Sequence, residues 1–342
     1  MLYVVIIFLW ASIFLYLLLG GADFGAGIIE LFTSGANKKQ TRKTMYKAIG
    51  PVWEANHMWL IITIVILFVG FPAIYTTMSV HLHIPLAIML LGIIARGTAF
   101  AFRHYDAVVD EMQVVYNKIF VYSSFITPLF LGIIAGSAVS GQIDPSANTF
   151  LSAYIFSWLH WFSLSVGLFT VAICGFLAAV YLIGETENEL DRKRFIQKAR
   201  LMNIAAVFCG ALVFFAASVE GIPLSEWIFG STLGIAAITA ATISLIFLWY
   251  FLYKGKTIIL RLLAGFQVCM ILLATTVRHF PNIVILKNGQ YLSLLEHKGQ
   301  DKVIDMLAWA LLLGSLFILP ALFYLIYAFQ KKSTVNTGTH QP

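Results

Sequence analysis

Nine long apolar runs determine what this chain can fold into. Each contains about 20 residues or more, the length that an α-helix needs to cross the hydrocarbon core of a bilayer. Several are longer, so we expect helices that tilt or extend beyond the bilayer. The expected spans are 2–32, 51–71, 79–103, 118–141, 152–184, 200–219, 230–253, 257–279 and 304–330. The sequence therefore predicts an all-α integral membrane protein in which residues 1–342 form a single polytopic membrane domain.

The composition excludes a water-soluble protein. Only 11% of the residues are charged and 60% are hydrophobic, whereas soluble domains carry about 25% charged residues. The net charge of +6 is explained by basic loops on the cytoplasmic side of a membrane. The chain has no nucleic-acid-binding motif, so we expect the lipid bilayer and no nucleic acid as its surroundings.

The cysteines and the N-terminus also fit a membrane protein. Cys174, Cys209 and Cys269 lie far apart within apolar runs and form no CxxC or CxxCH motif. They indicate packing residues, and neither a disulfide framework nor a c-type haem. The first apolar run lacks a basic flank and a cleavage site and is too long for a secretory signal, so we interpret it as a retained span.

The distribution of Lys and Arg orients the spans. Seventeen of the 22 Lys and Arg residues fall in connections on one side, four fall on the other side, and Arg96 lies inside a span. The positive-inside rule then places the N-terminus outside and the C-terminus in the cytoplasm. On the cytoplasmic side, the mixed-charge stretch 184–200 is expected to extend a helix. On the outside, segment 281–303 contains short apolar stretches that we expect to lie on the membrane surface or to dock a partner.

An aspartate inside the first span is the strongest candidate for a functional residue. Asp23 lies in the segment GGADFGAG, flanked by Gly21, Gly25 and Gly27. A carboxylate in a bilayer must face protein, water or a partner, and such residues form proton relays. Gly21 and Gly25 are one helical turn apart, a spacing that allows a second helix to approach closely. Asp23 is therefore predicted either to handle protons or to make a structural hydrogen bond to a neighbouring helix.

Three further charged residues are expected on the cytoplasmic half. Glu54 lies in the first turn of the second span, where it either complements the helix dipole or takes part in a relay. Arg103 ends the third span and either snorkels to the headgroups or points inward. Arg96 lies two turns deeper, where pairing with an acid or with an anionic group of a cofactor is expected. A route from the cytoplasm would pass Glu54 and Arg103 towards Asp23 and Arg96.

The histidines do not form a recognisable metal centre. The eight histidines are scattered, and the sequence contains no HExxH motif. His57, His160 and His279 are the candidates for haem ligation, but we expect no metal or haem ligated by this chain.

Three motifs together resemble a known family. GxDxGxG at Gly21–Gly27, WExNxxWL at Trp53–Leu60 and RGxxFxFR at Arg96–Arg103 are similar to motifs of subunit II of cytochrome bd-type quinol oxidases. The order of the motifs and the nine spans also resemble that family, although the motifs cover only the first third of the chain. The motif residues beyond those discussed above are Trp53, Asn56, Trp59 and Phe100.

The resemblance implies that this chain is one of two subunits with different roles in aerobic respiratory electron transport. Subunit I of such oxidases holds the b- and d-type haems and the quinol site, and subunit II packs against it as a heterodimer and is linked to proton supply. The proton-linked acids would be Asp23 and Glu54. Some relatives carry another acid in the third motif, where this chain has Ala101. The resemblance also implies a bacterial plasma membrane protein, with a bound quinone and a small accessory subunit as further candidates.

Two other functions remain open from the residues alone. A self-sufficient secondary transporter for a cation or small solute would use Asp23 and Arg96 for coupled-ion binding. Such transporters have broken helices at paired positions, and the glycine-rich interruption of the first span is the only candidate break in the sequence. A purely structural role, in which the chain is an assembly scaffold for its partner, is the second alternative.

Overall fold

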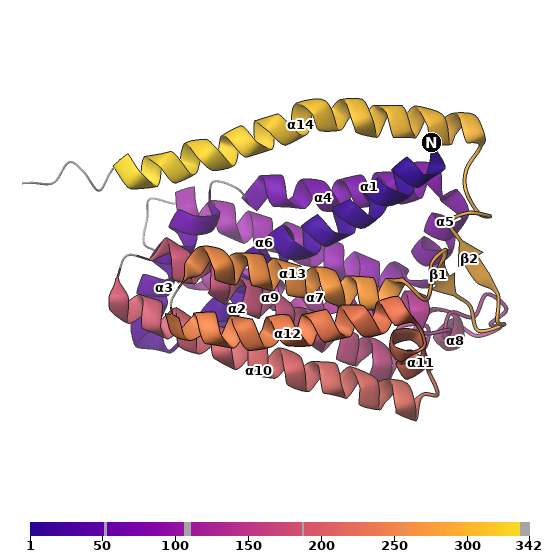
Figure 1. The fold of residues 1–342 in the computed structure, drawn as a ribbon, viewed down its shortest axis with the longest axis horizontal. Helices are drawn as coiled ribbons and strands as arrows, with labels where there is room; N and C mark the ends of the chain where they lie inside the picture. Colours follow the sequence, from indigo (N-terminus) through magenta and orange to yellow (C-terminus); the bar gives the residue numbers. More distant parts are fainter. Residues whose placement is uncertain (51–52, 106–110, 187, 255, 336–342) are drawn as a thin grey trace, which may run out of the picture.

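The prediction of nine membrane-spanning helices is confirmed. The computed structural model describes all residues except 51–52, 106–110, 187, 255 and 336–342. Within the described residues, nine helices are long and apolar enough to cross a membrane. They form one elongated bundle (Figure 1). The spans are Leu2–Leu31, Trp53–Gly70, His83–Arg103, Met112–Val139, Trp161–Glu185, Glu189–Val219, Thr232–Lys254, Thr257–Thr276 and Asp301–Leu322.

Within the described residues, the chain forms 14 α-helices and two π-helical turns. The first span consists of α1 (Leu2–Leu15), the π-helical turn η1 (Tyr16–Gly20) and α2 (Gly21–Leu31). The next elements are α3 (Gly35–Ile49), α4 (Trp53–Val65), η2 (Ile66–Gly70), α5 (Pro72–His81) and α6 (His83–Tyr105). The second span consists of α4 and η2, and the third lies in α6. The middle of the chain contains α7 (Glu111–Val139), α8 (Phe150–Tyr154), α9 (Trp161–Glu185) and α10 (Glu189–Val219). The last helices are α11 (Leu224–Phe229), α12 (Thr232–Lys254), α13 (Thr257–Thr276) and α14 (Asp301–Val335).

Helix α9 forms the centre of the bundle. In its most apolar segment 78% of the residues are buried, compared with 17% for α14. Helix α14 lies along one edge of the bundle, apart from α10 and α12 (Figure 1). Because α9 packs against α2, α7 and α10, it holds the first span in the protein interior.

The two ends of the bundle differ in character. One end carries α3, whose sequence includes Lys38, Lys39, Arg42 and Lys43; we call it the basic end, and it is the end that the charge distribution predicts to be cytoplasmic. The opposite end carries the strands β1 (Asn282–Ile285) and β2 (Tyr291–Ser293), and we call it the hairpin end. The basic end lies on the left of Figure 1 and the hairpin end on the right.

The fifth span begins later than expected. A helix over 152–184 was predicted, but α9 begins at Trp161 and is preceded by the separate short helix α8. The reason is a cap: His160 is extended (φ −143°, ψ 163°), and the Glu220 carboxylate accepts hydrogen bonds from the main-chain N–H groups of Trp161 and Phe162. Free N–H groups at a helix start need such acceptors, and the acceptor comes from the end of α10.

Three other spans begin four or more residues away from the expected start. The third span begins at His83 instead of residue 79, because Leu82 leaves helical geometry (φ −111°, ψ 21°). The fourth and sixth begin earlier than residues 118 and 200, at Met112 and Glu189. At the start of α10, the Asn188 side chain accepts a hydrogen bond from the N–H of Leu190, as helix-capping residues do. The expected helical extension over 184–200 is therefore confirmed from Glu189 onwards.

Segment 281–303 folds against the bundle, and residues of both apolar stretches pack on the chain itself. Contact of this segment with the membrane surface or with a partner stays a prediction. Strands β1 and β2 pair antiparallel, and Val284, Leu286 and Leu294 are buried. The N–H of Lys287 donates to the carbonyl of Ile143 at 2.9 Å. The hairpin thereby covers apolar side chains at its end of the bundle.

Candidate functional site

Asp23 and Arg96 form a buried, bidentate ion pair between α2 and α6. Arg96 Nη1 donates to Asp23 Oδ2 and Nη2 to Oδ1, both at 2.8 Å, and Nη2 also donates to the main-chain carbonyl of Asp23 at 2.9 Å. Each residue is 1% exposed. The remaining donor, Nε, bonds Ser124 Oγ of α7 at 3.0 Å. Charge-assisted hydrogen bonds are about twice as strong as those between neutral groups, and the bidentate arrangement also fixes the geometry of the pair.

The glycines around Asp23 allow the neighbouring helices to approach. A Cβ atom on Gly25 would lie 1.8 Å from the carbonyl oxygen of Cys174 on α9, and one on Gly27 would lie 2.2 Å from Ser124 Oγ on α7. Gly21 is less crowded, with the Cys174 sulfur at 3.3 Å. The absent side chain of Gly27 brings Ser124 close enough to bond Arg96. The glycines do not interrupt the helix, since α2 continues through them.

A second buried acid, Glu30, was not predicted from the sequence. Arg103 Nη2 donates to Glu30 Oε2 at 2.8 Å, while Arg42 of α3 donates to Oε1 from Nε at 3.1 Å and from Nη2 at 2.7 Å. Glu30 is 1% exposed. Arg103 therefore points inward and does not snorkel, and its side chain is 2% exposed.

The two ion pairs are separated by the same interval on both helices. Glu30 follows Asp23 by seven residues on α2, and Arg103 follows Arg96 by the same interval on α6. Residues seven apart lie on one helix face, so both pairs occupy the same interface between the two spans. This repeated interval was the sequence signal that would have identified Glu30.

The ring of Phe120 on α7 contacts both guanidinium groups. Its centroid lies 5.0 Å from Arg96 Cζ and 4.7 Å from Arg103 Cζ, within the range of cation–π interactions. Ser124, one turn further along α7, bonds Arg96. One helix face of α7 thus supports both cations.

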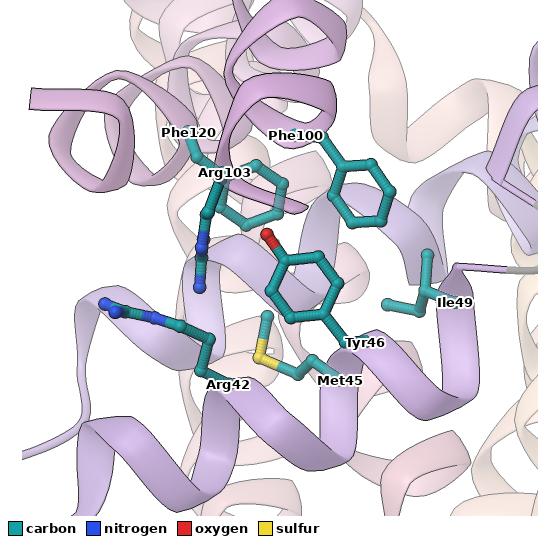
Figure 2. Close-up of a pocket in the computed structure, with 7 residues that line it drawn as sticks. All are labelled: Arg42, Met45, Tyr46, Ile49, Phe100, Arg103 and Phe120. Carbon is teal, nitrogen blue, oxygen red and sulfur yellow. The ribbon is translucent and has the colours of Figure 1, made fainter. Parts of the chain in front are cut away.

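A small pocket adjoins the second pair at the basic end. Figure 2 shows the aromatic ring of Tyr46 between the guanidinium groups on one side and apolar side chains on the other. The pocket has room for about one water molecule. Burial raises the pKa of Tyr46 to about 12. Arg103 Nε and Nη1 have no hydrogen-bond partner within the described part of the chain. The lining residues are Arg42, Met45, Tyr46, Ile49, Phe100, Arg103 and Phe120.

The second motif contributes His57 to the first pair, whereas Glu54 lies apart from it. Glu54 is in the first turn of α4 and is exposed. His57, one turn later, places Nε2 3.8 Å from Asp23 Oδ2. Sequence reasoning considered His57 only as a haem ligand; its helical spacing from Glu54 was the available signal.

The remaining motif residues form the packing around this site. Asn56 and Trp59 are buried, and so is Phe100. The ring of Trp53 lies 5.2 Å from that of Phe100. These residues hold α4 against the first and third spans.

The candidate histidines do not fit a haem. The ring of His57 is enclosed by aromatic rings with centroids 5.6 to 6.4 Å away. His160 Nδ1 bonds Glu220 Oε2 at 2.9 Å, and its other nitrogen is buried. The ring of His279 packs edge-on against Trp227, with centroids 4.1 Å apart. Each of these rings is thus held by packing or hydrogen-bond contacts within the chain.

The fold and the site define a multi-pass helical membrane protein with paired charges in its interior. Residues 1–329 match the family described as cytochrome bd terminal oxidase subunit II. The chain belongs to this family.

Individual relatives agree with this assignment. The chain is 29% identical over 206 residues to cytochrome bd ubiquinol oxidase subunit 2 of Bacillus subtilis, covering 59% of this chain and 58% of that protein. It is 27% identical over 218 residues to cytochrome bd-I ubiquinol oxidase subunit 2 of Escherichia coli, covering 61% and 56%. The matched region thus spans less than two thirds of either relative.

A solved structure has the same fold. A chain of the bd oxidase from Geobacillus thermodenitrificans superposes with a TM-score of 0.77 over 96% of this chain and 98% of that chain, at 18% identity. The nine-helix architecture is therefore shared along almost the whole length.

Proposed function

We propose that this chain is the haem-free subunit II of a cytochrome bd-type terminal oxidase. In this function the complex oxidises quinol and reduces oxygen to water, with proton uptake from the cytoplasm. The chain forms a heterodimer with subunit I, which binds the b- and d-type haems and the quinol. The assignment of the haems to subunit I agrees with the poor fit of His57, His160 and His279 to a haem.

The observation that carries the proposal is the column of buried charges in a member of this family. Asp23 and Glu30 lie on one face of the first span, each bonded to an arginine of α6. Intramembrane acids are costly unless they are paired, and they commonly mark proton pathways. The column extends from the basic end into the membrane interior, along the direction that proton uptake requires.

Glu54 and Asp23 are the proposed pathway acids, with Arg96 and Arg103 as their charge partners. Glu54 is exposed at the start of α4, where water at the basic end reaches it. Asp23 lies deeper and is fixed by Arg96. In the proposed function, a route between them supplies protons to the reaction in the neighbouring subunit.

A secondary transporter is not supported. That alternative used Asp23 and Arg96 to bind a coupled ion, but both carboxylate oxygens of Asp23 accept hydrogen bonds from Arg96. The family match favours the oxidase as well.

Purification of the chain with its natural partner tests the proposal. The expected result is a larger co-purifying subunit, haem b and haem d absorption bands, and oxygen consumption on addition of quinol. A colourless protein that runs alone and takes up solute would contradict the proposal.

An Asp23→Asn variant of the complex tests the proton-pathway role separately. We expect lower oxygen consumption at normal haem content, because the ionised carboxylate is lost while the shape is kept. Normal turnover in both Asp23→Asn and Glu54→Gln variants would instead indicate an assembly scaffold.

A further inference from the structure

His57 occupies the gap between the two proposed pathway acids. It lies three residues after Glu54 on α4, so the two side chains are neighbours on the helix surface. Its Nε2 atom lies 3.8 Å from Asp23 Oδ2. The His57 side chain is 17% exposed. A single imidazole thus lies about one helical turn from the exposed acid and 3.8 Å from the buried acid.

The bonding of Asp23 argues against a role as the mobile proton carrier. Both of its carboxylate oxygens accept hydrogen bonds from Arg96. Adding a proton to Asp23 breaks this pair and leaves a buried guanidinium without its counter-charge, which is strongly unfavourable. Asp23 and Arg96 are better suited to act as a fixed pair of charges.

The surroundings of His57 suit a group that gains and loses a proton. The distance of 3.8 Å to Asp23 is too long for a hydrogen bond, so the ring is not locked by that contact. Its Nδ1 atom is buried with no hydrogen-bond partner among the described residues. Imidazole can accept a proton on one nitrogen and release it from the other near neutral pH.

The charged and titratable groups that face His57 come from four elements. The Asp23 carboxylate on α2 attracts a protonated ring. The Arg96 guanidinium on α6, which is bonded to that carboxylate, repels a protonated ring. Tyr16 on η1 lies with its ring centroid 6.2 Å from that of His57. Glu54 precedes it on α4. Burial of the ring disfavours the imidazolium form, and the nearest charge, the Asp23 carboxylate, favours it.

We propose that His57 carries the proton between Glu54 and the interior of the subunit, and that Asp23 and Arg96 position and polarise its ring. A proton from water or from Glu54 adds to one ring nitrogen, and the other nitrogen releases its proton to a water molecule on the interior side of the ring. The imidazole returns to its neutral form, and the charges of Asp23 and Arg96 do not change. This inference rests on the proposed function and names a carrier for it.

The test uses the complete complex with His57→Gln, which keeps a polar side chain of similar length but does not titrate. We expect quinol-driven oxygen consumption to fall about 10²-fold, the lower end of the effect of a positioned proton-transfer group. We also expect the change in turnover with pH near neutrality to disappear. His279→Gln is the matched control, since His279 is also partly buried with an unpartnered ring nitrogen but lies at the hairpin end; its turnover should equal that of the wild type.

Imidazole added to a His57→Ala complex provides an independent readout. Partial recovery of turnover is expected for a proton carrier, whereas a packing role predicts none. Unchanged turnover and an unchanged pH profile in His57→Gln, or no recovery of a slowed His57→Ala complex that keeps its haem, would overturn the inference. These results leave the proposed function intact if the wild-type complex shows haem bands and quinol oxidation; a wild type without them refutes that function instead.

Discussion

Arg96 satisfies both carboxylate oxygens and the main-chain carbonyl of Asp23 with a single guanidinium group, inside a membrane-spanning bundle. The two residues are 73 positions apart in the chain. The pair joins the first and third spans, so its disruption is expected to lower stability.

We expect Asp23→Asn to lower the free energy of unfolding by about 3–5 kcal/mol, because it leaves Arg96 buried without a counter-charge. The double variant Asp23→Asn with Arg96→Gln should lose less than the sum of the two single variants, since the residues are in contact. Denaturant unfolding of the purified complex in detergent measures these differences. Additive losses would show that the pair does not act as a unit.

Glycine substitutions should rank by the space around each position. Gly25→Ala places a methyl group 1.8 Å from a main-chain oxygen of Cys174, so we expect loss of assembly or a large fall in thermal stability. Gly21→Ala meets side-chain atoms alone, the nearest being the Cys174 sulfur at 3.3 Å, and should be mild. Gly35→Ala on α3 has nothing within 4 Å and is the control. Melting temperatures of the three complexes test this order, and equal effects at Gly25 and Gly35 would contradict the close approach of α2 and α9.

The second ion pair predicts an asymmetry between Glu30 and its two partners. Glu30→Gln should destabilise the protein by about 3–5 kcal/mol, because Arg103 is then buried without a counter-charge. Arg42→Gln should lower the free energy of unfolding by about 1 kcal/mol or less, since the Arg42 side chain is 27% exposed and Glu30 remains paired with Arg103. Parallel unfolding experiments on both variants measure the difference. Equal losses would indicate that Arg42 carries as much of the interaction as Arg103.

The cap at the start of α9 should weaken in acid. Burial lowers the pKa of His160, although Glu220 acts in the opposite direction. A folded-state pKa below the unfolded value means that the stabilising contribution is present above about pH 6.5 and is lost as the pH falls through the folded-state value. We therefore expect the amide protons of Trp161 and Phe162 to lose protection from exchange as the pH falls below about 6.5.

Hydrogen–deuterium exchange with correction for intrinsic rates measures this protection. In a His160→Gln variant the dependence on pH should disappear, whereas a variant of the exposed His83 should retain it. Protection that increases in acid would show that attraction to Glu220 outweighs burial.

Particular residues show where sequence reasoning succeeded and where it did not. Asp23, Arg96 and the flanking glycines were identified because a charge or a cluster of small residues is conspicuous in an apolar run. Glu30 lies in the same run, yet its partners are Arg42 from the following helix and Arg103 from the third span. His57 was considered for the wrong role, because its distance from Asp23 depends on how α4 packs on the first span.

The sequence by itself determined the number of spans and the presence of buried charge, because a bilayer requires each crossing segment to be apolar and locally hydrogen-bonded. The tertiary structure decided which charges meet, where α9 begins and how segment 281–303 packs. These features depend on contacts between residues far apart in the chain: Arg96 reaches Asp23 across 73 positions, and Glu220 caps α9 from 59 positions away. Local hydropathy carries no information on such contacts, since they arise only when the helices pack.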